Sequence, residues 1–173
     1  APGAAKRDEE AAFPREEVKA LGELGLMGML IPEDLGGAGA DYVSMALAIE
    51  EIAAADGAIS TIVSVQNSLV GAGLLKFGND WQKKEFLTPL AQGKLLGAFA
   101  LSEPQAGSDA AALRCTAQKQ GGHYVLNGTK QFITSGKYAD IAIVFAVTDK
   151  AAGKKGISAF IVPTDTPGYS VPK

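Results

Sequence analysis

The stretch ALSEPQAGSD, from Ala100 to Asp109, gathers several chemically capable side chains directly after an apolar run. Its carboxylates could act as general acids or bases. Its hydroxyls and backbone N–H groups, with Gly107 allowing close backbone approach, could instead hold a polar, planar or anionic ligand. A turn capped by Ser108 and Asp109, with no ligand, explains the same residues equally well.

A second stretch, Asn127 to Gly136, places an aromatic, an aliphatic and a hydroxyl side chain in succession at Phe132, Ile133 and Thr134. If this stretch is a strand, Phe132 and Thr134 project from one face and Ile133 from the other. An aromatic ring and a hydroxyl on one face suit the edge of a ring system that carries hydrogen-bonding nitrogens. Ordinary core packing accounts for the same triplet.

The remaining reactive residue types are scarce. Cys115 is the only cysteine, which excludes an internal disulfide and any metal site built from several cysteines. A histidine-based zinc site or a Ser-His-Asp triad would depend on His123 alone, and we expect His123 to be a solvated residue at a hairpin turn. The sequence also lacks a dinucleotide-type glycine motif, a Walker A motif, HExxH and GxSxG. No metal site is therefore expected.

The composition is that of an ordinary globular protein. The 173 residues, 47% of them hydrophobic, are enough for one large or two small domains with a buried core. The net charge of −3, without a basic tract, argues against nucleic acid as a partner. No uninterrupted apolar stretch approaches the ~20 residues of a membrane-spanning helix, so no membrane is expected. The chain starts and stops abruptly, at Ala1 and Lys173, as a fragment would.

Helical periodicity dominates the sequence up to residue 94. Apolar spacing predicts helices around 14–24, 42–56, 58–77 and 81–93. Asp41 is placed to cap the second helix and Gly78-Asn79-Asp80 the fourth, which should kink or end near Pro89. The segment 58–77 is apolar nearly all round, which is typical of a helix buried between other helices. Together these segments predict a helical bundle.

After residue 94 the pattern changes to short strands separated by turn residues. Gln120-Gly121-Gly122 predicts a hairpin. The spacing of the segments predicts an antiparallel barrel or sandwich. The fold class is therefore α+β, with an all-α helical bundle domain at 1–94 followed by a β domain at 95–173. The strand candidates are 95–101, 113–119, 123–128, 130–134, 140–147, 157–162 and 169–171.

Taken together, these features resemble the acyl-CoA dehydrogenase family, most closely its short-chain members. The resemblance covers nearly the whole chain in sequence order. It implies an N-terminal helical domain, a middle β domain that is truncated here, and a C-terminal four-helix domain that is absent. The matching stretches are LGLMGMLIPEDLGGAGADY, AIEEIA, VQNSL, KFGNDWQKKEFLTPLAQGK, FALSEPQAGSD, YVLNGTKQFIT and KGISAFIVPTDTPG.

The resemblance also implies a chemistry. Family members carry FAD in a cleft between the β domain and the C-terminal helices, and the acyl-CoA thioester lies against the flavin. A base takes the α proton while the β hydride passes to the flavin, which gives the 2,3-enoyl-CoA. Electrons then leave to an electron-transfer flavoprotein. A homotetramer, in a bacterial cytoplasm or a mitochondrial matrix, is the implied setting.

Carried onto this sequence, the resemblance implies two flavin-contacting segments. In the first, Leu101 and Ser102 face the pyrimidine side of the ring, and Ser108 lies near both flavin and CoA. In the second, the hydroxyl of Thr134 points toward the central flavin nitrogen. Many relatives have tryptophan at the position of Phe132 and glycine at that of Gln105. The implied cofactor-binding residues are Phe99, Ala100, Leu101, Ser102, Gly107, Ser108, Phe132, Ile133 and Thr134.

The substrate and the base are less directly indicated. The helix at 58–77 would form the floor of the acyl pocket, with Gln66, Asn67 and Leu69 joining Ser108 as substrate-binding candidates, although ordinary helix packing explains them as well. The family's base is a glutamate of the C-terminal region, expected beyond Lys173. Glu103 is not expected to replace it. Two alternatives stay open, namely an acyl-CoA oxidase-like flavoprotein and a non-catalytic binding module on the same fold.

Overall fold

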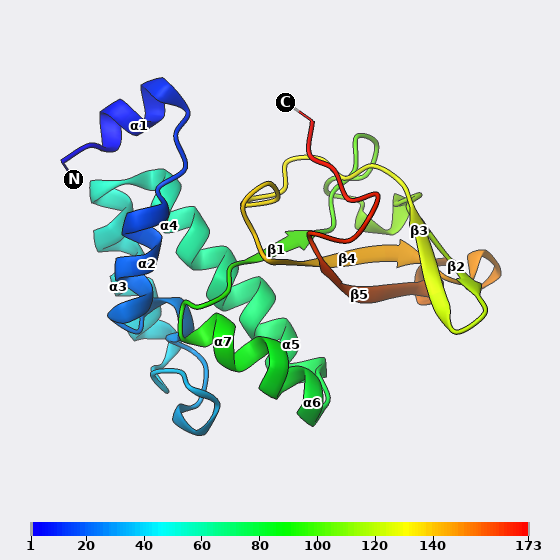
Figure 1. Ribbon diagram of the computed structural model, residues 1–173, viewed down its shortest axis with the longest axis horizontal. Helices are drawn as coiled ribbons and strands as arrows, with labels where there is room; N and C mark the ends of the chain where they lie inside the picture. The colour runs from blue at the N-terminus through cyan, green and yellow to red at the C-terminus, as the bar shows by residue number, and fades with distance from the viewer. Residues whose placement is uncertain (1, 173) are drawn as a thin grey trace. The chain divides into compact units, whose positions relative to one another are not determined.

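The computed structural model describes residues 2–172 and divides into two compact units, Ala1–Gly97 and Ala98–Lys173 (Figure 1). The first unit consists of helices and loops, and the second is built around a five-stranded sheet to which β1 belongs. The prediction of a helical first part followed by a sheet is therefore confirmed.

Residues 2–97 of the first unit contain seven α-helical segments. The helices predicted around 14–24, 42–56, 58–77 and 81–93 are present, and α1 is an additional one. The sequence AAKRDEE of α1 has no apolar face, and none of its residues is buried, so hydrophobic periodicity could not reveal it. The bounds are α1 (Ala4–Glu10), α2 (Arg15–Glu23), α3 (Tyr42–Ala55), α4 (Gly57–Ser64), α5 (Ala72–Phe77), α6 (Asp80–Gln82) and α7 (Thr88–Ala91).

A long helical run, Gly57–Phe77, joins α4 and α5 through a π-helical segment at Val65–Gly71. Contrary to our expectation, this run is long and apolar enough to cross a membrane by length and composition alone. Half of the most apolar part of this run is buried inside the protein, as in the core helix of a helical domain. Val63 and Val70 are completely buried, which agrees with the prediction of a helix packed between others.

The caps predicted for the helices at 42–56 and 81–93 are present. The Asp41 carboxylate accepts a hydrogen bond from the Ser44 N–H at 2.7 Å, at the start of α3. Asn79 and Gln82 form a reciprocal capping box at the start of α6. The last helical run passes Pro89 and ends at Ala91, after a π-helical segment that precedes the proline. Pro89 lies in the first turn of α7, where a missing N–H is tolerated.

The sheet of the second unit has the order β1-β4-β2-β3, and β5 pairs with β4. The pairs β2–β3 and β4–β5 are antiparallel, but β2 and β4 run parallel where Thr116 faces Val147, so the sheet is mixed. Gln120 faces His123 across the predicted Gly121-Gly122 turn. The strands are β1 (Gly97–Ala100), β2 (Thr116–Gln120), β3 (His123–Asn127), β4 (Ile141–Val147) and β5 (Ile157–Pro163).

Two predicted strands, 130–134 and 169–171, are not strands in the structure. Phe132 has a φ of 58° and Ser135 a φ of 61°, which lie in the left-handed region rather than the extended one. The alternation of faces inferred for Phe132, Ile133 and Thr134 is therefore wrong, because it holds only for extended backbone. The segment is a loop that leads into a turn.

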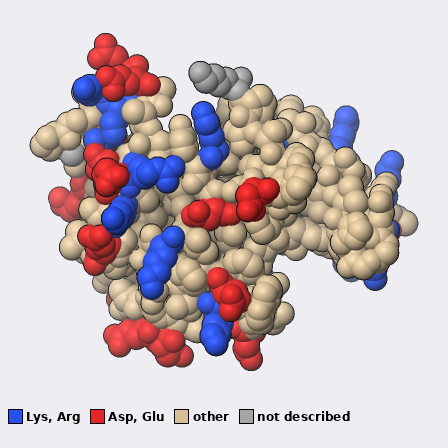
Figure 2. Space-filling model, in the orientation of Figure 1, with Lys and Arg blue, Asp and Glu red and all other residues tan. Residues whose placement is uncertain are grey.

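Charged side chains of both signs are interspersed on the face of the molecule shown in Figure 2, without a continuous basic tract. This distribution accords with the small net charge of −3.

Candidate functional site

Two loops of the second unit, 101–109 and 128–136, lie side by side. The Gln131 N–H donates a hydrogen bond to the Ser102 carbonyl oxygen at 2.9 Å. The Lys130 ammonium donates to the Leu101 carbonyl oxygen at 3.1 Å. The structure therefore brings together the two segments that the sequence singled out, although they are about 30 residues apart.

The first loop closes on itself in a tight turn. Glu103 and Ala106 exchange two backbone hydrogen bonds, of 2.9 and 3.0 Å, with Pro104 and Gln105 at the tip. Proline at the second position suits such a turn because its φ is already set. Asp109 precedes a short 3-10 helix at Ala110–Ala112, but its side chain makes no capping hydrogen bond, so the capping role predicted for it is wrong.

The Glu103 carboxylate anchors this loop from inside. The side chain is 2% exposed and lies 2.8 Å from the Lys130 ammonium. It also accepts hydrogen bonds from the N–H groups of Arg114 (2.6 Å) and Cys115 (2.9 Å) and from the Gln105 amide (2.7 Å). Burial by itself raises the pKa of Glu103, but these donors outweigh it and lower the pKa to about 2. Glu103 is therefore an ionised anchor, and a poor proton acceptor.

The expected flavin-contacting residues of the first loop span the end of β1 and its continuation. Phe99 is half-buried and its ring lies 5.0 Å from that of Phe145, whereas Ala100 is buried. Leu101 and Ser102 are half-buried, and Gly107 and Ser108 are exposed. The strand end thus packs into the sheet, and Gly107 and Ser108 farther along the loop face solvent.

The second loop presents an aromatic ring to solvent. Phe132 is 90% exposed on a left-handed backbone, while Ile133 and Thr134 are half-buried. A non-glycine residue in this conformation is uncommon and persists where the surroundings hold it. Such a ring has the shape and polarity to lie against a planar apolar ligand.

The hydroxyls of the two loops are available to a ligand. Within residues 2–172, no hydrogen-bond partner is found for the hydroxyl of Ser102, Ser108 or Thr134. Hydroxyl donors beside an exposed aromatic ring fit the polar and apolar parts of a flavin. The residues present therefore fit the cofactor that the sequence resemblance implies.

Gln66 and Asn67 hold the helical unit together. Gln66 is 1% exposed, and its amide bonds the carbonyls of Leu90 and Leu95 and the N–H of Gly97, all at 2.9–3.0 Å. Asn67 is fully buried and donates to two backbone carbonyls. These contacts support the packing interpretation of both amides. Leu69, by contrast, is 40% exposed.

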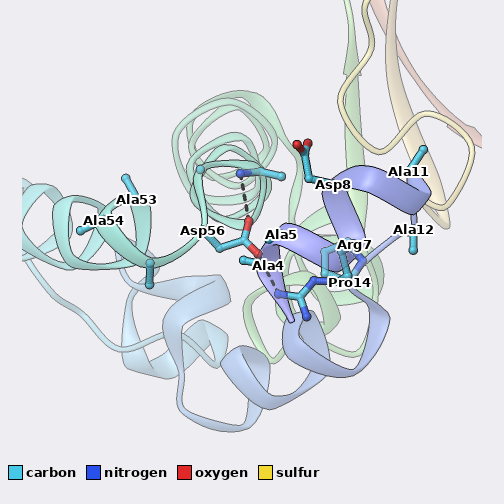
Figure 3. Close-up of a pocket in the computed structure, with 13 residues that line it drawn as sticks. Ala4, Ala5, Arg7, Asp8, Ala11, Ala12, Pro14, Ala53, Ala54 and Asp56 are labelled. Carbon is cyan, nitrogen blue, oxygen red and sulfur yellow. Dashed lines mark hydrogen bonds and ion pairs between the residues drawn. The ribbon is translucent and has the colours of Figure 1, made fainter. Parts of the chain in front are cut away.

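A pocket that the sequence analysis missed lies between α1 and the junction of α3 with α4 (Figure 3). Alanines line most of it. Its charged lining residues are Arg7, Asp8 and Asp56, and Arg7 pairs with Asp56 at 2.7 Å and also with Glu17. The hydrogen bond from Arg7 is the main cause that lowers the pKa of Asp56. Because two carboxylates neutralise Arg7, the described lining residues present no uncompensated positive charge.

Comparison with known proteins decides the family. Residues 1–94 match the family described as "Acyl-CoA dehydrogenase, N-terminal domain", and residues 98–173 match "Acyl-CoA dehydrogenase, middle domain". This chain belongs to the acyl-CoA dehydrogenase family. Within residues 2–172 no group of three or more His, Cys, Asp and Glu residues is placed to hold a metal ion.

Individual acyl-CoA dehydrogenases are similar over almost the whole chain. The rat "Short-chain specific acyl-CoA dehydrogenase, mitochondrial" is 48% identical over 172 residues, which are 99% of this chain and 42% of the relative. The solved butyryl-CoA dehydrogenase from Megasphaera elsdenii is 43% identical with a TM-score of 0.92, over 97% of this chain and 45% of that one. The chain thus spans less than half the length of these acyl-CoA dehydrogenases.

A third relative carries the expected cofactor. The glutaryl-CoA dehydrogenase from Mycobacterium smegmatis, solved in complex with FADH2, is 42% identical with a TM-score of 0.90. The match covers 98% of this chain and 42% of that one. The acyl-CoA dehydrogenase architecture of the first two domains is therefore shared with a protein that binds reduced flavin.

Proposed function

We propose that the protein containing this chain is a FAD-dependent acyl-CoA dehydrogenase that oxidises a short-chain acyl-CoA to the trans-2,3-enoyl-CoA. The observation that carries the proposal is the pairing of the loops 101–109 and 128–136 by Gln131 and Lys130. This pairing brings the loop that carries Ser102 beside the loop that carries Phe132 and Thr134. Within residues 2–172 the hydroxyls of Ser102 and Thr134 have no hydrogen-bond partner, and the Phe132 ring is exposed. The acceptor of the electrons is proposed to be an electron-transfer flavoprotein.

The chain's own residues would bind and orient the cofactor. Ser102 would offer its hydroxyl and backbone, with Leu101, to the pyrimidine side of the flavin, and Thr134 would offer its hydroxyl to the central nitrogen. Phe132 would cover part of the ring. Ser108 would lie where flavin and CoA both approach. Bound FAD would supply the hydride acceptor for the β hydrogen.

The group that removes the α proton is proposed to lie outside this chain. Glu103 is held as an ion by four donors, and a base must be free to reach the substrate proton. Among the three candidates on the helical run, Leu69 has an exposed side chain that could line the pocket, and Gln66 and Asn67 would support the pocket from within the helix. A homotetramer in a mitochondrial matrix or a bacterial cytoplasm is the proposed setting.

The test uses the full-length protein. We expect flavin absorbance in the purified protein and bleaching by butyryl-CoA under anaerobic conditions, weaker with longer acyl chains. A colourless protein, or a flavin that butyryl-CoA does not bleach, would rule the proposal out. Rapid reoxidation of the bleached flavin by dioxygen, without an electron-transfer flavoprotein, would favour the oxidase-like alternative.

A single substitution examines the flavin site directly. Thr134→Ala should weaken FAD binding about fivefold, because it removes one hydrogen-bond donor from a site that retains the others. Thr129→Ala is the matched control, since Thr129 lies in the same loop and is exposed. Equal FAD affinities in the two variants would remove Thr134 from the proposed site.

A further inference from the structure

The peptide that links Leu101 to Ser102 is held in one orientation. Lys130 donates to the Leu101 carbonyl oxygen at 3.1 Å, and the next peptide is held by Gln131, which donates to the Ser102 carbonyl oxygen at 2.9 Å. Peptide bonds in the described chain are trans. In a trans peptide the carbonyl and the N–H point in opposite directions. The hydrogen bond from the Lys130 ammonium to the Leu101 carbonyl therefore fixes the direction of the Ser102 N–H, which points away from Lys130.

Lys130 is itself held in place. Its side chain is 11% exposed, and its ammonium lies 2.8 Å from the Glu103 carboxylate. That carboxylate is anchored in turn by the N–H groups of Arg114 and Cys115. Because the ion pair with Glu103 already restricts the rotamers of Lys130, the contact with Leu101 costs little additional side-chain entropy.

The Ser102 N–H is available to a ligand. None of the residues 2–172 accepts a hydrogen bond from it, and Ser102 is only half-buried. A cation at the carbonyl end of a peptide polarises the group and strengthens its N–H as a donor. The polarised donor and the Ser102 hydroxyl belong to one residue, at the edge of the proposed cofactor site.

We propose that Lys130, held by Glu103, is a positioning residue that orients and polarises the Leu101–Ser102 peptide so that the Ser102 N–H donates to the pyrimidine edge of the flavin. This inference rests on the proposed function, since it requires that the site bind FAD. It assigns to the Lys130–Glu103 pair a purpose beyond stabilising the loop. A stable loop requires hydrogen-bond donors for the buried Glu103 carboxylate, but it does not require Lys130 to contact the Leu101 carbonyl.

The test compares two partners of the same ion pair in the full-length protein. Lys130→Met removes the contact with Leu101, whereas Glu103→Gln keeps an oxygen acceptor that can hold Lys130 there. We measure the dissociation constant of FAD from the apo-protein, the visible spectrum of bound flavin, and thermal unfolding of the apo-protein. Lys119→Met is the control, because Lys119 is an exposed lysine on β2 of the same unit.

We expect Lys130→Met to weaken FAD binding about tenfold and to shift the flavin spectrum. Glu103→Gln should weaken FAD binding less than Lys130→Met does, because its amide oxygen can still accept a hydrogen bond from Lys130, and Lys119→Met should match the wild type. A purely stabilising role predicts that FAD affinity follows apo-protein stability across the variants. That pattern, or a folded Lys130→Met protein with unchanged affinity and spectrum, overturns the inference.

A charge-balanced variant covers the case in which Lys130→Met does not fold. Glu103→Gln with Lys130→Met removes both charges at once and leaves no unpaired ion in the buried site. The same tenfold weakening is expected of it, and wild-type affinity in the folded double variant would reject the inference. If the wild-type protein binds no flavin, the proposed function itself fails, which the wild-type measurement alone reveals.

Discussion

Replacing Glu103 by glutamine should cost the folded protein about 3 kcal/mol of unfolding free energy at neutral pH. The cause is the loss of a buried carboxylate that holds one ammonium and two backbone N–H groups. The pKa of Glu103 falls from 4.5 to about 2 on folding. A pKa difference of this size corresponds to about 3 kcal/mol at pH values well above 4.5.

The stabilisation by Glu103 should decrease as the pH falls. The folded-state pKa of Glu103 lies below the unfolded one, so the unfolded chain takes up the proton first as the pH falls. The stabilisation is therefore fully present above about pH 5 and is lost progressively between about pH 4.5 and 2. At pH 3 about 1 kcal/mol of it should remain.

The assay is urea denaturation of the apo-protein, followed by circular dichroism at pH 7 and at pH 3. The difference in unfolding free energy between wild type and Glu103→Gln should shrink from about 3 to about 1 kcal/mol. Glu85→Gln, at an exposed glutamate, serves as the control and should show no such change. A difference of equal size at both pH values would refute the reasoning, as would no difference at pH 7.

Three further changes probe the helical unit. Arg7→Ala should speed amide hydrogen exchange in α1 but not in α5, because α1 buries no residue and Arg7 ties it to Asp56 and Glu17; unchanged exchange in α1 would contradict this. Asn79→Ala removes the capping box and should cost about 1 kcal/mol in urea denaturation, whereas Asn79→Asp should not. Gln66→Leu removes the amide that bonds the Leu90 and Leu95 carbonyls and the Gly97 N–H, and it should cost about 3 kcal/mol or more. A variant as stable as the wild type would show that water replaces the amide.

Much of the fold could be predicted because its signals are local. The Asp41 side chain acts on a backbone N–H three residues away, and the Asn79–Gln82 box spans the same distance. The β2–β3 hairpin likewise depends on the two glycines between its strands. Interactions of this kind are encoded in adjacent residues, so the sequence pattern was sufficient to place them.

The segment 130–134 is a case in which the sequence pattern predicted the wrong secondary structure. Its composition is typical of a strand, yet Phe132 adopts a left-handed backbone. Lys130 is bound to Leu101 and Glu103, which are 29 and 27 residues away. Contacts over that distance set the course of the loop and override the local preference for extended backbone.

The sequence by itself determined four helical segments of the first unit, the caps at Asp41 and Asn79 and the family resemblance, and the comparisons confirm the family. The tertiary structure alone decided the part played by Glu103. A glutamate in a polar turn could be a base, a cap or an anchor, and its ionisation depends on burial and on donors brought from Lys130, Arg114 and Cys115. Those donors become neighbours only when the chain has folded, because hydrogen bonds act over a few ångströms of space rather than along the sequence.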